Sequence, residues 1–140
     1  MNRRTIGRGR VVAGIGAILT LVGCFLPWVT GGGDGGLPAI SKNAFENGIG
    51  ILVFLAAIGI LALIALPYAA GDRRLGIDRP AAFVLLVSIG IAGFATRAIQ
   101  LVGLEALGLP DRALGFWLSA LGLVVMAWGA AEVVGERRTD

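Results

Sequence analysis

Residues 48–70, GIGILVFLAAIGILALIALPYAA, form a run of 23 residues without a charged side chain. A helix rises about 1.5 Å per residue, so roughly 20 apolar residues cross a hydrocarbon core about 30 Å thick. Three further apolar runs of similar length occupy residues 11–29, 81–103 and 113–134. In the first run we expect the helix to end at Leu26-Pro27-Trp28, because proline lacks a backbone donor and disfavours helical geometry in the residue before it. The sequence therefore predicts an all-α protein, an integral membrane four-helix bundle.

The composition supports the same class. Apolar residues make up 56% of the 140-residue chain and charged residues 15%, which is too apolar for a soluble domain of this size. In lipid every backbone amide and carbonyl must be bonded within the protein, so only helices or a closed barrel remain. The runs are continuous rather than alternating, which favours helices. We expect residues 1–140 to form a single membrane domain, with an outer loop at 30–47.

The basic residues give the expected orientation. Nine of the twelve lie before the first run, between the second and third, or after the fourth. Cytoplasmic segments of membrane proteins carry an excess of Arg and Lys. We therefore expect a multi-pass protein of the cell inner (plasma) membrane with both termini in the cytoplasm. The same distribution accounts for the pI near 10, so the expected surroundings are the lipid bilayer and no nucleic-acid partner is expected.

Several kinds of chemistry are excluded by residue type. Cys24 is the single cysteine, so the chain has no internal disulfide and no CxxC pair. The chain has no histidine, which excludes a histidine-ligated metal or haem and a histidine general base. We expect no cofactor, no metal site and no enzymatic activity.

Small residues recur along two of the predicted spans, and the fourth span opens with Gly115 and Ser119. Gly16, Thr20 and Cys24 are spaced by four in the first span, and Ser88 and Ala92, followed by Thr96, repeat this spacing in the third. Because the hydrophobic effect does not draw helices together in lipid, small residues take over by letting backbones approach. These positions are predicted helix-packing ridges. Packing within the bundle is the favoured interpretation, and contact with another subunit is the alternative.

Cys24 also has a second interpretation. Residues 21–24, LVGC, match the bacterial lipobox and follow an arginine-rich start and a short apolar core. Processing there would make Cys24 a lipidated N-terminus and leave three spans. Against this, the apolar run continues beyond the cysteine to residue 29, which completes a full span.

Arg97 is the one charged residue well inside a predicted span. A charge at mid-membrane costs about 2.5–3.5 kcal/mol on insertion scales, so it needs a partner or must snorkel to the headgroups. Thr96, Arg97 and Gln100 share a broad helix face and form a candidate intramembrane polar cluster. The candidate counter-ions of Arg97 are acidic residues of the outer loops: Asp34, Glu46 and Glu105.

The tryptophans and the loop residues complete the expected topology. Trp28, Trp117 and Trp128 fall near span ends and are predicted to anchor the protein at the membrane interface. Ser41 is predicted to cap a short helical turn in the outer loop, and Asp111 to cap the fourth span.

A short motif resembles that of a known type of protein. Residues 23–30, GCFLPWVT, are followed by a glycine-rich loop and then by Glu46-Asn47-Gly48. This pattern resembles a widespread group of small, largely uncharacterised bacterial four-helix membrane proteins with FLPW at the end of the first span. The resemblance implies topology and bacterial origin, without an activity. The tetraspan arrangement is also similar to claudin-type proteins, whose paired loop cysteines this chain lacks.

The expected function follows from these features. We expect a non-enzymatic accessory or assembly subunit of a larger membrane complex, which binds other membrane protein subunits or copies of itself. The alternative is a small oligomeric transporter or channel with a polar path near Arg97. The absence of an acidic residue near mid-span weakens that alternative, because proton-coupled transporters rely on such a group.

Overall fold

Four long helices make up most of the protein. The computed structural model describes residues 7–32, 38–69, 79–105 and 111–136. The helices are α1 (Arg8–Phe25), α2 (Gly50–Ala69), α3 (Arg79–Glu105) and α4 (Leu114–Glu136). Each is long and apolar enough to cross a membrane, so the predicted all-α class and the four apolar spans are confirmed at this level.

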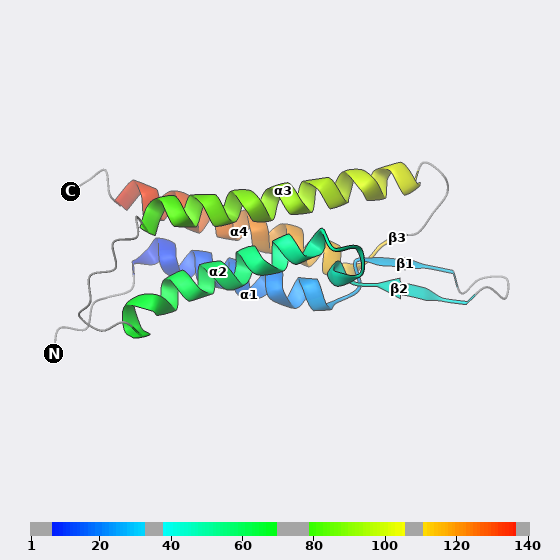
Figure 1. The fold of residues 1–140 in the computed structure, drawn as a ribbon, viewed down its shortest axis with the longest axis horizontal. Coiled ribbons are helices and arrows are strands. Elements are labelled where there is room, and N and C mark those ends of the chain that lie inside the picture. The colour runs from blue at the N-terminus through cyan, green and yellow to red at the C-terminus, as the bar shows by residue number, and fades with distance from the viewer. Residues whose placement is uncertain (1–6, 33–37, 70–78, 106–110, 137–140) are drawn as a thin grey trace.

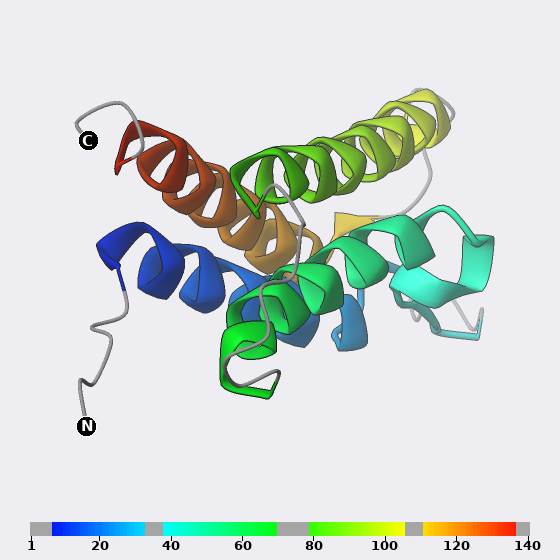
Figure 2. The same cartoon turned by 60° about the vertical axis from the view of Figure 1, so that its left-hand side comes forward.

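The helices form a ring in which each one contacts two neighbours. By far the most extensive contact joins α1 to α4, whereas α3 and α4 contact each other least among the neighbours. Helix α2 packs against α1 and α3 and closes the ring (Figures 1 and 2). Helix α1 begins and α4 ends at one end of the bundle, which we call the terminal end. The buried hydrophobic side chains fill the space between the helices.

A small sheet lies at the opposite end, which we call the sheet end (Figure 1). Its strands are β1 (Val29–Gly31), β2 (Ile40–Lys42) and β3 (Asp111–Arg112), in the antiparallel order β2-β1-β3. Two backbone bonds around Trp28 extend the pairing, from Trp28 N to Lys42 O at 2.8 Å and from Ala113 N to Trp28 O at 2.9 Å. The sheet therefore ties the end of α1 to the segments that precede α2 and α4.

Helix α1 ends at Phe25, next to the predicted end at Leu26-Pro27-Trp28, because Leu26, which precedes Pro27, is extended. Two predicted helix caps differ from the structure. Ser41 does not cap the short helix of the outer loop, since it lies in β2. The cap of η1 (Ala44–Asn47) is Asn43, whose Oδ1 accepts a bond from Phe45 N at 3.1 Å.

The predicted cap of the fourth span is also corrected. Asp111 lies in β3 and not next to the first residue of α4. An amide in the first turn of α4 instead finds a partner across the bundle, since Gly115 N donates to Pro27 O at 2.9 Å. The helix begins where the short strand pairing with β1 ends, so its start is set by a contact far away in sequence.

Candidate functional site

The contact between α1 and α4 is built on six glycines. In α1 they are Gly9, Gly16 and Gly23, and in α4 they are Gly115, Gly122 and Gly129, each set spaced by seven residues. A seven-residue repeat keeps one helix face turned toward a partner over several turns. All six glycines are buried. We call this face of the two helices the glycine seam.

The glycine seam brings the two helix backbones into direct contact. A Cβ atom at Gly23 would lie 3.0 Å from Gly115 O, and one at Gly115 would lie 2.8 Å from Gly23 O. Gly9 and Gly129 form a second pair of this kind. A Cβ atom at Gly9 would lie 2.9 Å from Gly129 O, and one at Gly129 would lie 2.7 Å from Gly9 O. Gly16 and Gly122 form a third such pair between these two. All three pairs leave no room for a side chain, which is the kind of close approach that joins helices in lipid.

Two hydroxyl residues lie between the glycines of the seam. Thr20 is fully buried and its Oγ1 donates to Gly16 O in the preceding turn at 2.9 Å. Ser119 is also fully buried. Its side chain lies next to Gly23 and beside the Cys24 thiol. The predicted ridge of the first span therefore lies inside the bundle. Spacing by four identified Gly16, Thr20 and Cys24, but the shared spacing by seven in both helices was the signal that the sequence analysis missed.

The predicted ridge of the third span lies on the opposite side of its helix from the bundle. Ser88, Ala92 and Thr96 are all exposed. Both hydroxyls bond to carbonyls of their own helix, from Ser88 Oγ to Val84 O and from Thr96 Oγ1 to Ala92 O, each at 2.8 Å. We call these three residues the α3 stripe. It presents small side chains outward, and its hydroxyls are already bonded.

Arg97 lies on the side of α3 that faces the bundle. Only 7% of its surface is exposed, and the neighbouring inward residues of α3 are apolar, among them Leu101. Its Nη1 donates to Gln100 Oε1 at 3.2 Å. The structure therefore joins two members of the predicted polar cluster. Thr96, the third member, lies on the exposed side of the helix.

The candidate counter-ions of Arg97 fall into two groups. Glu46 Oε2 lies 3.8 Å from Lys42 Nζ, four residues earlier in the outer loop. Asp34 and the side chain of Glu105 lie outside the described residues. A buried guanidinium is stable only where hydrogen bonds replace its water, and Gln100 supplies one of these bonds.

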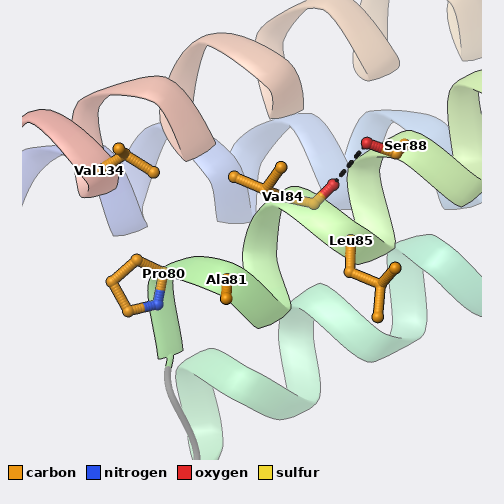
Figure 3. Close-up of a pocket in the computed structure, with 6 residues that line it drawn as sticks. All are labelled: Pro80, Ala81, Val84, Leu85, Ser88 and Val134. Carbon is orange, nitrogen blue, oxygen red and sulfur yellow. Dashed lines mark hydrogen bonds between the residues drawn. The ribbon is translucent and has the colours of Figure 1, made fainter.

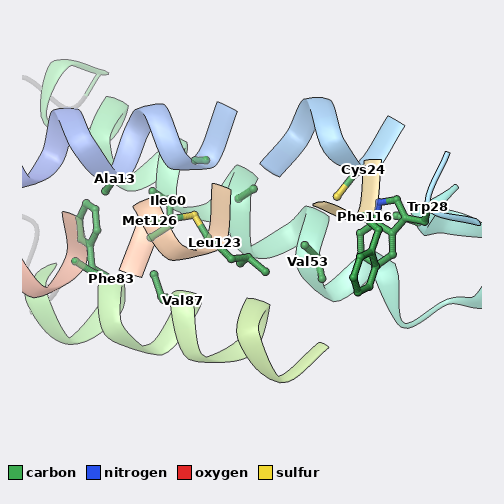
Figure 4. Packing of buried hydrophobic residues seen from close by; sticks show 14 of the residues in the cluster. Ala13, Cys24, Trp28, Val53, Ile60, Phe83, Val87, Phe116, Leu123 and Met126 are labelled. Atoms are coloured by element: carbon green, nitrogen blue, oxygen red, sulfur yellow. The ribbon is translucent and has the colours of Figure 1, made fainter. Parts of the chain in front are cut away.

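Trp28 differs from its predicted role as an interface anchor. Its ring is 0% exposed and packs edge-on against Phe94 and Phe116, with centroid distances of 5.6 and 5.9 Å. Figure 4 shows Trp28 and Phe116 together at one end of the core. Its Nε1 donates to Gly23 O at 2.9 Å, so the indole needs no water or headgroup as partner. Trp28 thus closes the sheet end of the bundle from inside.

The other two tryptophans lie on the surface of α4. Trp117 and Trp128 are exposed, as membrane-interface anchors must be. Trp128 Nε1 donates to Glu132 Oε1 at 2.9 Å, so its polar edge is held toward the terminal end. The two lie about 16 Å apart along α4, so Trp117 is near the sheet end and Trp128 is between the middle of the helix and the terminal end.

Among the residues that the structure describes, no side-chain cluster identifies a reaction. Within residues 7–32, 38–69, 79–105 and 111–136, no group of three His, Cys, Asp or Glu residues is placed to hold a metal ion. No family model matches the chain, and the comparisons with curated proteins and with solved structures gave no match. The geometry of the surfaces therefore carries the functional inference.

Proposed function

We propose that this protein is a non-enzymatic accessory or assembly subunit of a larger complex in a bacterial inner membrane. In this proposal the bundle binds a transmembrane helix of another membrane protein through the outer face of α3. The observation that carries the proposal is the outward position of the α3 stripe, Ser88, Ala92 and Thr96.

The reasoning begins with what lipid favours. A helix face turned to acyl chains gains nothing from small or hydroxyl side chains, whereas a face that meets another helix gains close backbone approach. The glycine seam uses small residues in this way inside the bundle. The α3 stripe offers a second small-residue surface that no helix of this chain covers among the described residues. A helix from a partner protein would complete it.

The stripe also meets the polar requirement of a helix interface. The Ser88 and Thr96 hydroxyls each bond to a carbonyl of α3. A partner helix therefore needs no matching polar group and is free to approach with apolar or small side chains. Contact of this kind is van der Waals packing, which suits a stable assembly subunit.

The charge distribution supports the proposed orientation. The terminal end and its flanking segments carry nine basic and five acidic residues, whereas the sheet end carries three basic and four acidic residues. Positive charge is retained on the cytoplasmic side of a membrane. Both termini are therefore proposed to be cytoplasmic, with the small sheet on the outer side.

The alternative of a transporter or channel receives less support. It requires Thr96, Arg97 and Gln100 to line one polar path. Arg97 is buried against the bundle and Thr96 is exposed on the other side of α3. In one copy of the chain these residues do not face a common space, so the subunit role is preferred.

Co-purification tests the proposal. Tagged protein extracted in mild detergent from its native host is expected to bring down a membrane protein partner in fixed stoichiometry. Ala92→Phe places a large ring on the α3 stripe and is expected to lose the partner. Leu121→Phe introduces the same ring at an exposed position of α4 and is expected to retain it. Equal recovery with both variants would contradict the assignment of the stripe.

A further inference from the structure

Three phenylalanines from separate segments pack together at the sheet end of the bundle. They are Phe25 at the end of α1, Phe45 in η1 and Phe54 near the start of α2. The ring centroids lie 5.4 Å apart for Phe25 and Phe45, 5.9 Å for Phe25 and Phe54, and 5.2 Å for Phe45 and Phe54. Phe25 is 65% exposed and the other two side chains are half-buried. We call these three residues the Phe cluster, which presents an apolar face at the surface.

The Phe cluster ends a row of exposed apolar side chains on α1. The row recurs every three or four residues and so occupies one helix face: Val11, Ile15, Ile18, Val22 and Phe25. Helix α1 has 18 residues and is about 27 Å long, close to the hydrocarbon core of a bilayer at about 30 Å. The row therefore matches the depth of the acyl chains, and Phe25 lies at their boundary at the sheet end.

Charged side chains lie directly beyond the Phe cluster. In η1, Ala44 is 3% exposed and packs against the start of α2, where a Cβ atom at Gly50 would lie 2.9 Å from Ala44 Cα. Phe45 joins the cluster, whereas Glu46 is exposed and its Oε2 lies 3.8 Å from Lys42 Nζ. The surface thus changes from apolar to charged within η1. An amphipathic segment of this kind suits the boundary between acyl chains and headgroups.

The exposed aromatic side chains of the described residues gather toward the two ends of the bundle. Phe25 and Trp117 lie near the sheet end, Tyr68 lies in the last turn of α2, and Trp128 lies on the terminal half of α4. Figure 3 shows a different part of the surface, an open hollow between α3 and α4, whose six lining residues are aliphatic apart from Ser88. Aromatic side chains toward both ends of the spans are typical of residues that bind the two membrane interfaces.

From its exposed rings, its place at the end of the α1 row and the charged pair beyond it, we propose that the Phe cluster binds the membrane interface at the sheet end. The rings lie at the level where acyl chains join the headgroups, and η1 rests on the membrane with Lys42 and Glu46 among the headgroups. Interfacial segments bury their apolar face about 5–10 Å into this boundary. The Phe cluster thereby takes the anchoring role that the buried Trp28 does not have. It shares no residue with the α3 stripe and needs no partner protein.

Tryptophan fluorescence of the full chain in phosphatidylcholine vesicles tests this surface. The background protein carries Trp117→Phe and Trp128→Phe, so that the buried Trp28 alone gives the reference signal. The vesicles contain lipids brominated either near the carbonyl end or near the methyl end of the acyl chains, and acrylamide reports contact with water. The vesicles hold no other protein, so the result does not depend on the proposed subunit role.

One tryptophan is then added to this background at each of three levels. Ile40→Trp lies on the exposed strand β2, Phe45→Trp lies in η1, and Ile58→Trp lies at an exposed position in the middle of α2. We expect Phe45→Trp to lose more emission to bromine near the carbonyl end than to bromine near the methyl end. Ile58→Trp should show the reverse order, and Ile40→Trp should respond to acrylamide and to neither lipid.

A second variant keeps the test independent of the outer loop. Phe25→Trp places the reporter on α1 and should give the same quenching order as Phe45→Trp, even where a substitution in η1 disturbs the loop. Circular dichroism of each variant checks that the helices are retained. If both reporters respond like Ile40→Trp, the Phe cluster lies in water, and if both respond like Ile58→Trp, it lies within the hydrocarbon. Either result would overturn the proposal.

Discussion

Gly16 of α1 and Gly122 of α4 face each other with no side chain between them. A Cβ atom at Gly16 would lie 2.7 Å from Gly122 O, and one at Gly122 would lie 2.8 Å from Gly16 O. The contact is reciprocal and lies in the middle of the glycine seam, between the pairs formed by Gly23 with Gly115 and Gly9 with Gly129. The two helices that are furthest apart in the chain thus form the closest packed pair of the bundle.

Gly122→Ala is expected to destabilise the protein. The added methyl would also meet Thr20 N at 2.5 Å, and the backbone at this position has no flexible end that moves aside. Overpacking of this kind costs about 1–3 kcal/mol of unfolding free energy. Thermal unfolding in detergent, followed by circular dichroism, measures the loss.

Gly135→Ala provides the matched control on the same helix. A Cβ atom at Gly135 would have no neighbour within 4 Å, so the change removes a flexible residue without a clash. We expect stability unchanged or raised by up to about 1 kcal/mol. Equal effects at residues 122 and 135 would show that the seam does not hold α1 against α4.

The number and position of the helices could be predicted from the sequence, because a helix that crosses lipid needs about 20 consecutive apolar residues. The apolar runs at 48–70 and 113–134 agree closely with α2 and α4. The packing partners were harder to predict, since α1, α3 and α4 all carry small residues at regular spacing and spacing alone does not say which pair meets. Gly16 was identified as a packing residue, yet its partner Gly122 was not.

Features that depend on distant segments could not be predicted. The sheet joins residues near 30, 41 and 111, and each strand has no more than three residues, so no local pattern indicates it. In the sequence, Trp28 has the position of an interface anchor, because it lies near the end of the first apolar run. Its burial depends on Phe94 and Phe116, which come from other helices, and on the Gly23 carbonyl left accessible by the seam.

Arg97→Leu is expected to leave insertion intact and to lower thermal stability. The substitution removes the bond to Gln100 Oε1 and the other contacts of an arginine that is 7% exposed. Hydrogen bonds to charged groups contribute about 1.5–3 kcal/mol, so a loss of this size is expected.

The control for Arg97→Leu is Thr96→Val, which changes the neighbouring residue on the exposed side of α3. The Thr96 hydroxyl bonds only within its own helix, so we expect little change in the unfolding midpoint. An unchanged midpoint for Arg97→Leu would contradict the buried, hydrogen-bonded role of the guanidinium.

The mature protein is expected to retain residues 1–23. Cys24 is fully buried in α1, and this helix supplies half of the glycine seam. Cleavage before Cys24 would remove nearly all of α1 and expose the glycines of α4. Intact-mass measurement on protein purified from its native membrane should therefore give the full chain. A mass that lacks these residues and includes acyl chains would establish the lipoprotein alternative.

Thiol labelling tests the proposed orientation. In a Cys24→Ala background, Ser41→Cys places a thiol on the exposed strand β2, and Arg8→Cys places one at the exposed start of α1. A membrane-impermeant maleimide is expected to label Ser41→Cys in intact cells and Arg8→Cys only after the inner membrane is permeabilised. The opposite pattern would place both termini outside.

The mass of the native particle tests the central claim most directly. One chain has a mass of 14.4 kDa, so a complex extracted in mild detergent identifies its composition by weight. The subunit role predicts one copy of this chain, or a fixed number of copies, together with a different membrane protein that Ala92→Phe releases. Particles that contain only multiples of 14.4 kDa, or a single chain alone, would contradict it.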